Sequence, residues 1–130
     1  YIYTTALPPA VAAASLTALQ LLAQADEARA HLQQLQSRLR QELTAMGYHL
    51  WDSVSPIQPV MIGDAAQAMA YSDALLKHGL LVTAIRPPTV PKHTARLRVT
   101  LSASHTNQQL DQLLQAFYDL RHLDRSYHGA

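Results

Sequence analysis

Two arginines alternate with apolar residues along one predicted strand, and this pattern suggests chemistry more clearly than any other in the chain. Between Ala95 and Leu101 the apolar residues fall on one side, and Arg96, Arg98 and Thr100 fall on the other. A loop at 86–94 precedes the strand, and its three prolines fix the backbone without needing buried donors. Because a guanidinium binds a carboxylate through two parallel hydrogen bonds, the pattern favours a carboxylate-binding face. A solvated arginine pair explains it equally well.

Other familiar chemistries have no motif in this sequence. It has no glycine-rich phosphate loop, no paired-histidine metal motif and no nucleophile elbow. Seven histidines are scattered and cysteine is absent, so we expect neither a metal site nor a disulfide framework. The formal net charge of +1 gives no general attraction to nucleic acid or membrane. The lack of cysteine fits a reducing compartment such as the cytoplasm.

The elements that must position the arginines are helices and short strands. Apolar residues at helical spacing follow capping residues, such as Asp64 and the Thr106/Gln109 pair, and glycines mark the helix ends. We expect helices at about 8–24, from Asp26 as N-cap to Met46, from Asp64 to about His78, and from Thr106 to about Arg121, followed by a frayed tail. We expect strands at 57–62, 80–85 and 95–101.

These elements predict a single α+β domain over residues 1–130. A right-handed crossover would make the first two strands parallel, and the third would fit between them, antiparallel to both. The sheet would have about three strands, with helices on one face and the arginine face open. Pro59 lacks a backbone donor, so the strand at 57–62 should lie at an edge.

The segment from Ile85 to Thr106 resembles the C-terminal signature of the α-oxoamine synthases, a family of fold-type-I pyridoxal-phosphate enzymes. The opening run Tyr1–Pro9 and the segment Ser55–Pro59 also resemble this family, so the likeness covers nearly the whole chain. The form Ile-Arg-Pro-Pro-Thr-Val-Pro is similar to the oxononanoate synthase branch. The resemblance implies the small C-terminal domain of such an enzyme, with the helix at 8–24 between domains or at a dimer interface.

The resemblance also implies a reaction for the intact enzyme. A pimeloyl thioester, of coenzyme A or of a carrier protein, would condense with L-alanine and release carbon dioxide in biotin synthesis. Pyridoxal 5'-phosphate, bound to a lysine as a Schiff base, would act as the electron sink. The family works as a homodimer with shared active sites, and neither nucleic acid nor a membrane is an expected partner.

Five residues match family positions that contact substrate or cofactor. Arg98 matches the arginine that holds the carboxylate of the amino-acid substrate. Thr89 matches a threonine near the acyl chain, and Arg86, three residues earlier, is a weaker candidate for acyl or carrier contact. Thr4 and Thr5 match the position whose hydroxyls approach the cofactor phosphate of the partner subunit.

Two departures from the family stand out. His93 occupies a position that is usually glycine, and a left-handed backbone there would disfavour histidine. The only lysines, Lys77 and Lys92, lack the Schiff-base context of the family. We therefore expect a fragment without the cofactor-binding large domain, an expectation that the missing initiator Met supports, and no cofactor bound to this chain alone.

Three alternatives stay open at this point. The chain could come from another α-oxoamine synthase, such as one similar to 2-amino-3-ketobutyrate CoA ligase. It could be a free-standing module that binds a carboxylate ligand on the arginine face. A nucleic-acid site at Arg86, Arg96 and Arg98 is disfavoured by the low net charge and by the lack of interleaved aromatic residues.

Overall fold

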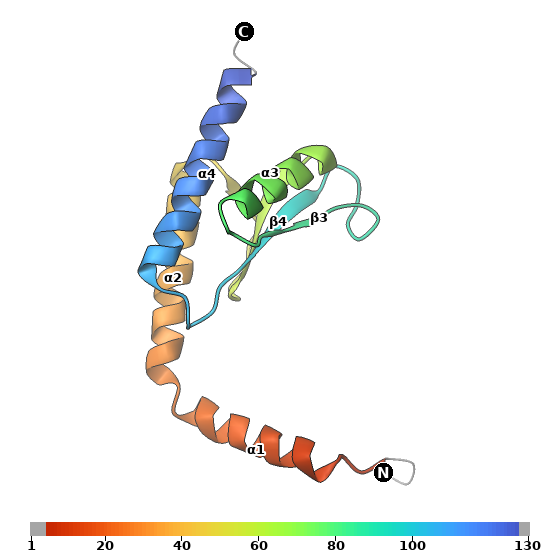
Figure 1. The fold of residues 1–130 in the computed structure, drawn as a ribbon, viewed down its shortest axis with the longest axis vertical. Helices are drawn as coiled ribbons and strands as arrows, with labels where there is room; N and C mark the ends of the chain where they lie inside the picture. The colour runs from red at the N-terminus through yellow and green to blue at the C-terminus, as the bar shows by residue number, and fades with distance from the viewer. Residues whose placement is uncertain (1–4, 128–130) are drawn as a thin grey trace.

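The computed structural model describes residues 5–127, and in that range it confirms a small α+β fold (Figure 1). The elements follow the predicted order, with one additional short strand before the first predicted one. In chain order they are α1 (Pro9–Ala23), α2 (Asp26–Ala45), β1 (His49–Leu50), β2 (Ile57–Gly63), α3 (Ala65–Lys77), β3 (Thr83–Ile85), β4 (Ala95–Thr100) and α4 (Asn107–Tyr127). The frayed tail expected after Arg121 is wrong, because α4 continues to Tyr127.

The strands form one sheet in the order β1-β2-β4-β3, and every neighbouring pair is antiparallel. The last strand therefore lies between β2 and β3, as predicted, and α3 makes the connection between those two parallel strands. The predicted strand at 80–85 is shorter in the structure, since only Thr83–Ile85 pairs with β4.

The prediction that Pro59 places its strand at the sheet edge is wrong, because β1 pairs with the outer side of β2. The Trp51 N–H, just after β1, donates to the Pro59 carbonyl oxygen over 3.0 Å. A normal residue at 59 would return a hydrogen bond to the Trp51 carbonyl, but proline has no donor. The Arg40 guanidinium supplies one instead, with its Nη1 3.1 Å from the Trp51 oxygen. A side chain of α2 thus makes a proline acceptable inside the sheet.

Capping residues define most helix ends as predicted. Asp64 accepts a hydrogen bond from the Gln67 N–H at the start of α3. Thr106 and Gln109 exchange the two hydrogen bonds of a capping box at the start of α4. Asp26 is not the N-cap of α2, since Ala25 takes that position and Asp26 pairs with Arg29 inside the first turn.

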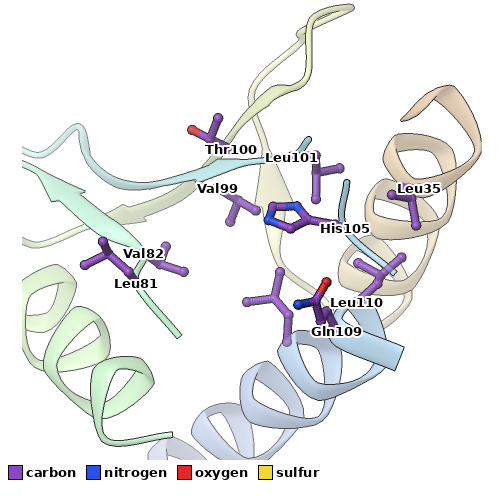
Figure 2. A pocket seen from close by; sticks show the side chains of 10 residues that line it. Leu35, Leu81, Val82, Val99, Thr100, Leu101, His105, Gln109 and Leu110 are labelled. Atoms are coloured by element: carbon purple, nitrogen blue, oxygen red, sulfur yellow. The ribbon is translucent and has the colours of Figure 1, made fainter. Parts of the chain in front are cut away.

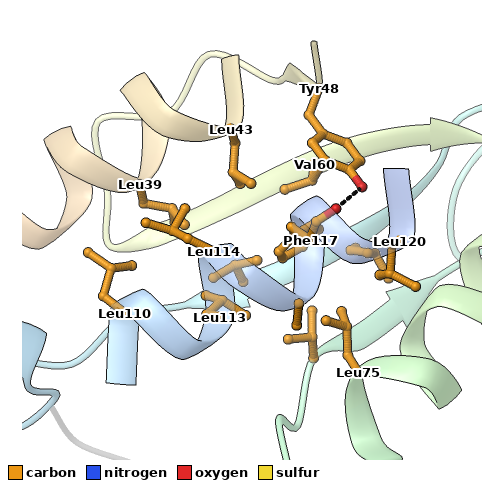
Figure 3. Packing of buried hydrophobic residues seen from close by; sticks show 14 of the residues in the cluster. Leu39, Leu43, Tyr48, Val60, Leu75, Leu110, Leu113, Leu114, Phe117 and Leu120 are labelled. Carbon is orange, nitrogen blue, oxygen red and sulfur yellow. Dashed lines mark hydrogen bonds between the residues drawn. The ribbon is translucent and has the colours of Figure 1, made fainter. Parts of the chain in front are cut away.

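The core lies between one face of the sheet and helices α2, α3 and α4 (Figure 3). Tyr48 packs edge-on against Phe117 at a centroid distance of 5.2 Å, and its hydroxyl donates to the Phe117 carbonyl oxygen over 2.9 Å. The largest apolar side chains with almost no exposure are Phe117, Leu35, Leu39, Leu43, Leu75, Leu97 and Val60. Helices therefore cover a single face, and the opposite face of the sheet, which carries the arginines, stays open.

Helix α1 has the predicted bounds but buries none of its residues. It extends away from the rest of the molecule, joined to it only through the start of α2 (Figure 1). Between residues 5 and 127, no helix combines the length and apolar character needed to cross a membrane.

Candidate functional site

The open face of β4 carries the residues that the sequence pattern predicted. Leu97 and Val99 are buried, whereas Arg96 is half-buried and Arg98 and Thr100 are exposed. The register places Arg98 beside Pro59 of β2 and Thr83 of β3, so it lies in the middle of the face.

The two arginines of this face differ in their contacts. Arg96 donates from Nε to the Thr94 carbonyl oxygen over 3.1 Å and from Nη2 to the Thr94 hydroxyl over 3.4 Å. Its guanidinium carbon also lies 5.0 Å from the centroid of the Trp51 ring. The Arg98 side chain has no hydrogen bond or ion pair with any residue that the structure describes. Arg98 is therefore the arginine of this face that is free to bind an external carboxylate.

The other predicted substrate residues lie in the loop that joins β3 to β4. Arg86 and Thr89 are both exposed, and the Thr89 N–H donates to the Arg86 carbonyl oxygen over 3.1 Å. Arg86 also reaches the Pro87 carbonyl oxygen at 3.4 Å. The loop continues from the Arg96 end of the face, because Ile85 pairs with Arg96. The structure thus places Arg86 and Thr89 near one end of the open face, and no hydrogen bond joins them to Arg98 within residues 5–127.

His93 has the left-handed backbone expected at its position, with a φ of 63°. The turn around it is closed by Thr94, whose N–H and hydroxyl both contact the Pro91 carbonyl oxygen, at 3.3 and 2.8 Å. The predicted conflict between a histidine side chain and this backbone is therefore present.

The predicted cofactor-phosphate residues, Thr4 and Thr5, precede α1 in the chain. Thr4 lies outside the described residues, and Thr5 is exposed in the segment before α1. That end of the chain is directed away from the sheet (Figure 1). A role of these hydroxyls at a partner's cofactor stays a prediction.

The lysines of this chain do not fit a Schiff-base site. Lys77 is exposed in the last turn of α3, on the helix-covered side of the sheet opposite Arg98. Lys92 is exposed in the proline loop. The part of the chain that the structure describes also has no group of three or more potential metal ligands.

Sequence reasoning missed a polar cluster beside the open face, formed by Arg40, Trp51 and Gln58. Gln58 is fully buried, and among the residues whose burial the structure describes it is the only buried polar or charged residue. Its Oε1 accepts a hydrogen bond from Arg40 Nη1 over 2.6 Å. A polar residue at a core-facing strand position is the feature of the sequence that could have revealed this cluster.

A pocket of ≈ 100 Å³ lies away from the open face, between the start of α4, the end of β4 and the segment before β3 (Figure 2). It is mostly apolar, and no residue predicted for the site lines it. His105 beside it is held structurally, since its Nδ1 accepts the Ser102 N–H over 3.1 Å and its carbonyl oxygen lies 2.8 Å from His31 Nε2.

Comparison with known proteins places this geometry in a family. The model of the family described as aminotransferase class I and II matches residues 1–117. The chain belongs to that family. An 8-amino-7-oxononanoate synthase of Hahella chejuensis is 54% identical over 93% of this chain and 31% of its own length. One of Marinobacter nauticus is 58% identical over 89% of this chain and 29% of its own length.

Solved structures show the same fold. A serine palmitoyltransferase of Sphingomonas wittichii is 38% identical with a TM-score of 0.83, over 93% of this chain and 31% of that chain. An 8-amino-7-oxononanoate synthase of Francisella tularensis is 30% identical with a TM-score of 0.79, over 96% of this chain and 36% of that chain. These matches confirm the resemblance to the α-oxoamine synthases and the relation to fold-type-I pyridoxal-phosphate enzymes. This chain spans less than a third of the curated relatives it matches.

Proposed function

We propose that residues 1–130 are the C-terminal small domain of a pyridoxal-phosphate-dependent 8-amino-7-oxononanoate synthase. The intact enzyme condenses a pimeloyl thioester, of coenzyme A or of a carrier protein, with L-alanine and releases carbon dioxide in biotin biosynthesis. It acts as a cytoplasmic homodimer. Relatives with that name at 54% and 58% identity support this assignment.

The observation that carries the proposal is the exposed, unpaired Arg98 in the middle of the open sheet face. An arginine fork can hold the alanine carboxylate in a fixed orientation, which a point charge would not. By holding the carboxylate, Arg98 would fix the orientation of the amino acid and so which of its bonds is aligned for reaction. The cofactor supplies the electron sink, and Arg98 supplies the alignment.

The remaining predicted residues have supporting roles in this proposal. Thr89 and Arg86, in the loop at the end of the arginine face, contact the acyl chain or its carrier. Thr4 and Thr5 approach the cofactor phosphate of the partner subunit. Helix α1, which buries nothing within this chain, packs between domains or against the partner.

The test is Arg98→Ala in the full-length enzyme, with the KM and kcat for alanine and for the acyl donor measured separately. Loss of a charged hydrogen-bond partner costs about 1.5–3 kcal/mol, or roughly 10- to 100-fold in alanine affinity. Arg98→Lys should not restore the activity fully, because an ammonium cannot form the two-pronged contact. Arg96→Ala is the matched control on the same strand face, and its effect on alanine should be smaller. A larger effect for Arg96→Ala would contradict the role of Arg98.

A second candidate is another α-oxoamine synthase, favoured by the serine palmitoyltransferase structures at 36–38% identity. A panel of alanine, serine and glycine with pimeloyl and longer acyl donors would separate the branches. Preference for serine with a long acyl chain, or for glycine with a short one, would move the assignment to another branch. A gene without a lysine-bearing domain upstream of Tyr1 would instead support a free-standing carboxylate-binding module.

A further inference from the structure

A polar cluster around the buried Gln58 ties α2 to the segment that leads into the open face. Arg40 donates from Nη1 to Gln58 Oε1 and to the Trp51 carbonyl oxygen. Gln58 donates from Nε2 to the carbonyl oxygens of Ser53 over 3.2 Å and Ser55 over 2.6 Å. Gln36 Nε2 also donates to the Ser53 oxygen over 3.4 Å, so three side chains hold the carbonyls of residues 51, 53 and 55. Because Gln58 is fully buried, its three bonds are partly shielded from water, whereas the bond from Arg40 to the Trp51 oxygen is exposed. Together these bonds hold the segment against α2.

The Trp51 ring reaches the arginine face from that fixed segment. Both backbone groups of Trp51 are hydrogen-bonded. The N–H donates to the Pro59 carbonyl oxygen, and the carbonyl oxygen accepts from Arg40. The ring lies 5.0 Å from the Arg96 guanidinium carbon, the geometry of a cation–π contact. Thr94 holds the same guanidinium through two hydrogen bonds. Arg96 is therefore held in place by Trp51 and Thr94 together.

A fixed Arg96 matters because Arg98 is only two residues away on the same face, about 7 Å along the strand. Either guanidinium, if mobile, could bind a carboxylate that enters this face. A carboxylate bound to Arg96 would be displaced from the position that Arg98 defines. Such a misplacement reduces the fraction of substrate in the reactive orientation.

We propose that Trp51, held by Arg40 and Gln58, is a positioning residue that keeps Arg96 from competing with Arg98 for the amino-acid carboxylate. The proposal rests on the function proposed above for Arg98, and it adds the reason why one of two neighbouring arginines binds substrate. Trp51 itself contacts neither the substrate nor the cofactor in this role.

The test is a double-mutant cycle in the full-length enzyme, with Trp51→Leu measured alone and combined with Arg96→Ala. Trp51→Leu should lower kcat/KM for the amino acid by roughly two- to fivefold, the weight of one partly exposed cation–π contact, and leave the KM for the acyl thioester unchanged. Trp51→Phe keeps an aromatic face and should lose less. Adding Arg96→Ala to Trp51→Leu should restore kcat/KM to that of Arg96→Ala alone, because the competing cation is gone.

Two results would overturn the proposal. One is an unchanged kcat/KM in Trp51→Leu. The other is a double variant that stays as impaired as Trp51→Leu and does not reach a higher kcat/KM of Arg96→Ala alone, which would mean that Trp51 only supports the fold. The proposed function is judged separately by Arg98→Ala in the otherwise unmodified enzyme. If that variant keeps full alanine affinity, the function of Arg98 is wrong, whatever the cycle gives.

Discussion

Arg96 and Arg98 show how far residue type and spacing can specify a site. The alternation along β4 predicts that both side chains share one open face, and the structure agrees. The alternation alone cannot predict that the Arg96 side chain is held by neighbours whereas the Arg98 side chain is free. That difference depends on Trp51, which is brought to Arg96 by strand pairing and by Arg40. Contacts between residues 45 positions apart leave no periodic pattern in a sequence, so this half of the site required the structure.

His93 illustrates a local conflict that the sequence does reveal. Its φ of 63° lies in the left-handed region, where a non-glycine residue costs about 1–2 kcal/mol. Glycine would remove that cost but loses about 0.5–1 kcal/mol through its greater freedom in the unfolded chain. We therefore expect His93→Gly to raise the free energy of unfolding by about 0.5–1 kcal/mol, measured by urea denaturation.

Lys92→Gly is the matched control for that variant, because Lys92 is the adjacent exposed residue and has no positive φ. It should be neutral or slightly destabilising. Equal stabilisation by both variants would show that the backbone at His93 is not the cause.

At the scale of elements, the sequence predicts the helices and strands that have a periodic apolar pattern or a capping residue. The helices α2, α3 and α4 have long apolar stripes, and α3 and α4 have caps that the structure confirms. Strand β1 was missed because two residues have no periodicity and become a strand only by pairing with β2. The edge rule for Pro59 failed because it considers the backbone alone, whereas Arg40 supplies the missing donor from another element.

The junction of α2 with the sheet should be sensitive to Gln58. In Gln58→Leu, the Arg40 guanidinium loses its shortest contact and the Ser55 carbonyl loses its donor. The Ser53 carbonyl keeps only the longer contact from Gln36. A buried polar group left without a partner costs about 1–3 kcal/mol. Because the groups around Gln58 are only partly buried, we expect a loss of about 1 kcal/mol in the free energy of unfolding, at the lower end of that range.

Gln33→Leu is the control for Gln58→Leu, since Gln33 is an exposed glutamine on α2. Its unfolding free energy should stay within about 0.5 kcal/mol of the original chain. A similar loss in both variants, measured by thermal unfolding with circular dichroism, would argue against a specific role of the buried cluster.

At the scale of the whole molecule, both lysines of this chain are exposed, and neither lies in a formed site. We expect that this chain alone forms no imine with pyridoxal phosphate at a defined lysine, because neither exposed lysine has a site around it. Adding the cofactor and recording absorption before and after borohydride reduction would check this. A stoichiometric, borohydride-fixed adduct on Lys77 or Lys92 would contradict it.

Helix α1 predicts a second property of the isolated chain. Its residues are mostly apolar around the whole circumference, a composition typical of buried helices, yet none of them is buried here. Leu16, Leu19 and Leu22 expose 59%, 64% and 56% of their surface, and a contiguous apolar patch of this kind drives association. We therefore expect the 130-residue chain to self-associate, with a sedimentation coefficient that rises with concentration, and to bind a dye specific for apolar surface.

The double variant Leu19→Gln/Leu22→Gln should weaken that association, because residues three apart lie on the same side of a helix. Leu81→Gln is the matched control: Leu81 is 86% exposed, but it lies in the segment before β3 and not on α1. It removes a comparable apolar surface and should leave association unchanged. If Leu81→Gln reduced association as much as the α1 variant, general surface hydrophobicity would be the cause. A chain that stayed monomeric at high concentration without binding the dye would show that α1 needs no partner.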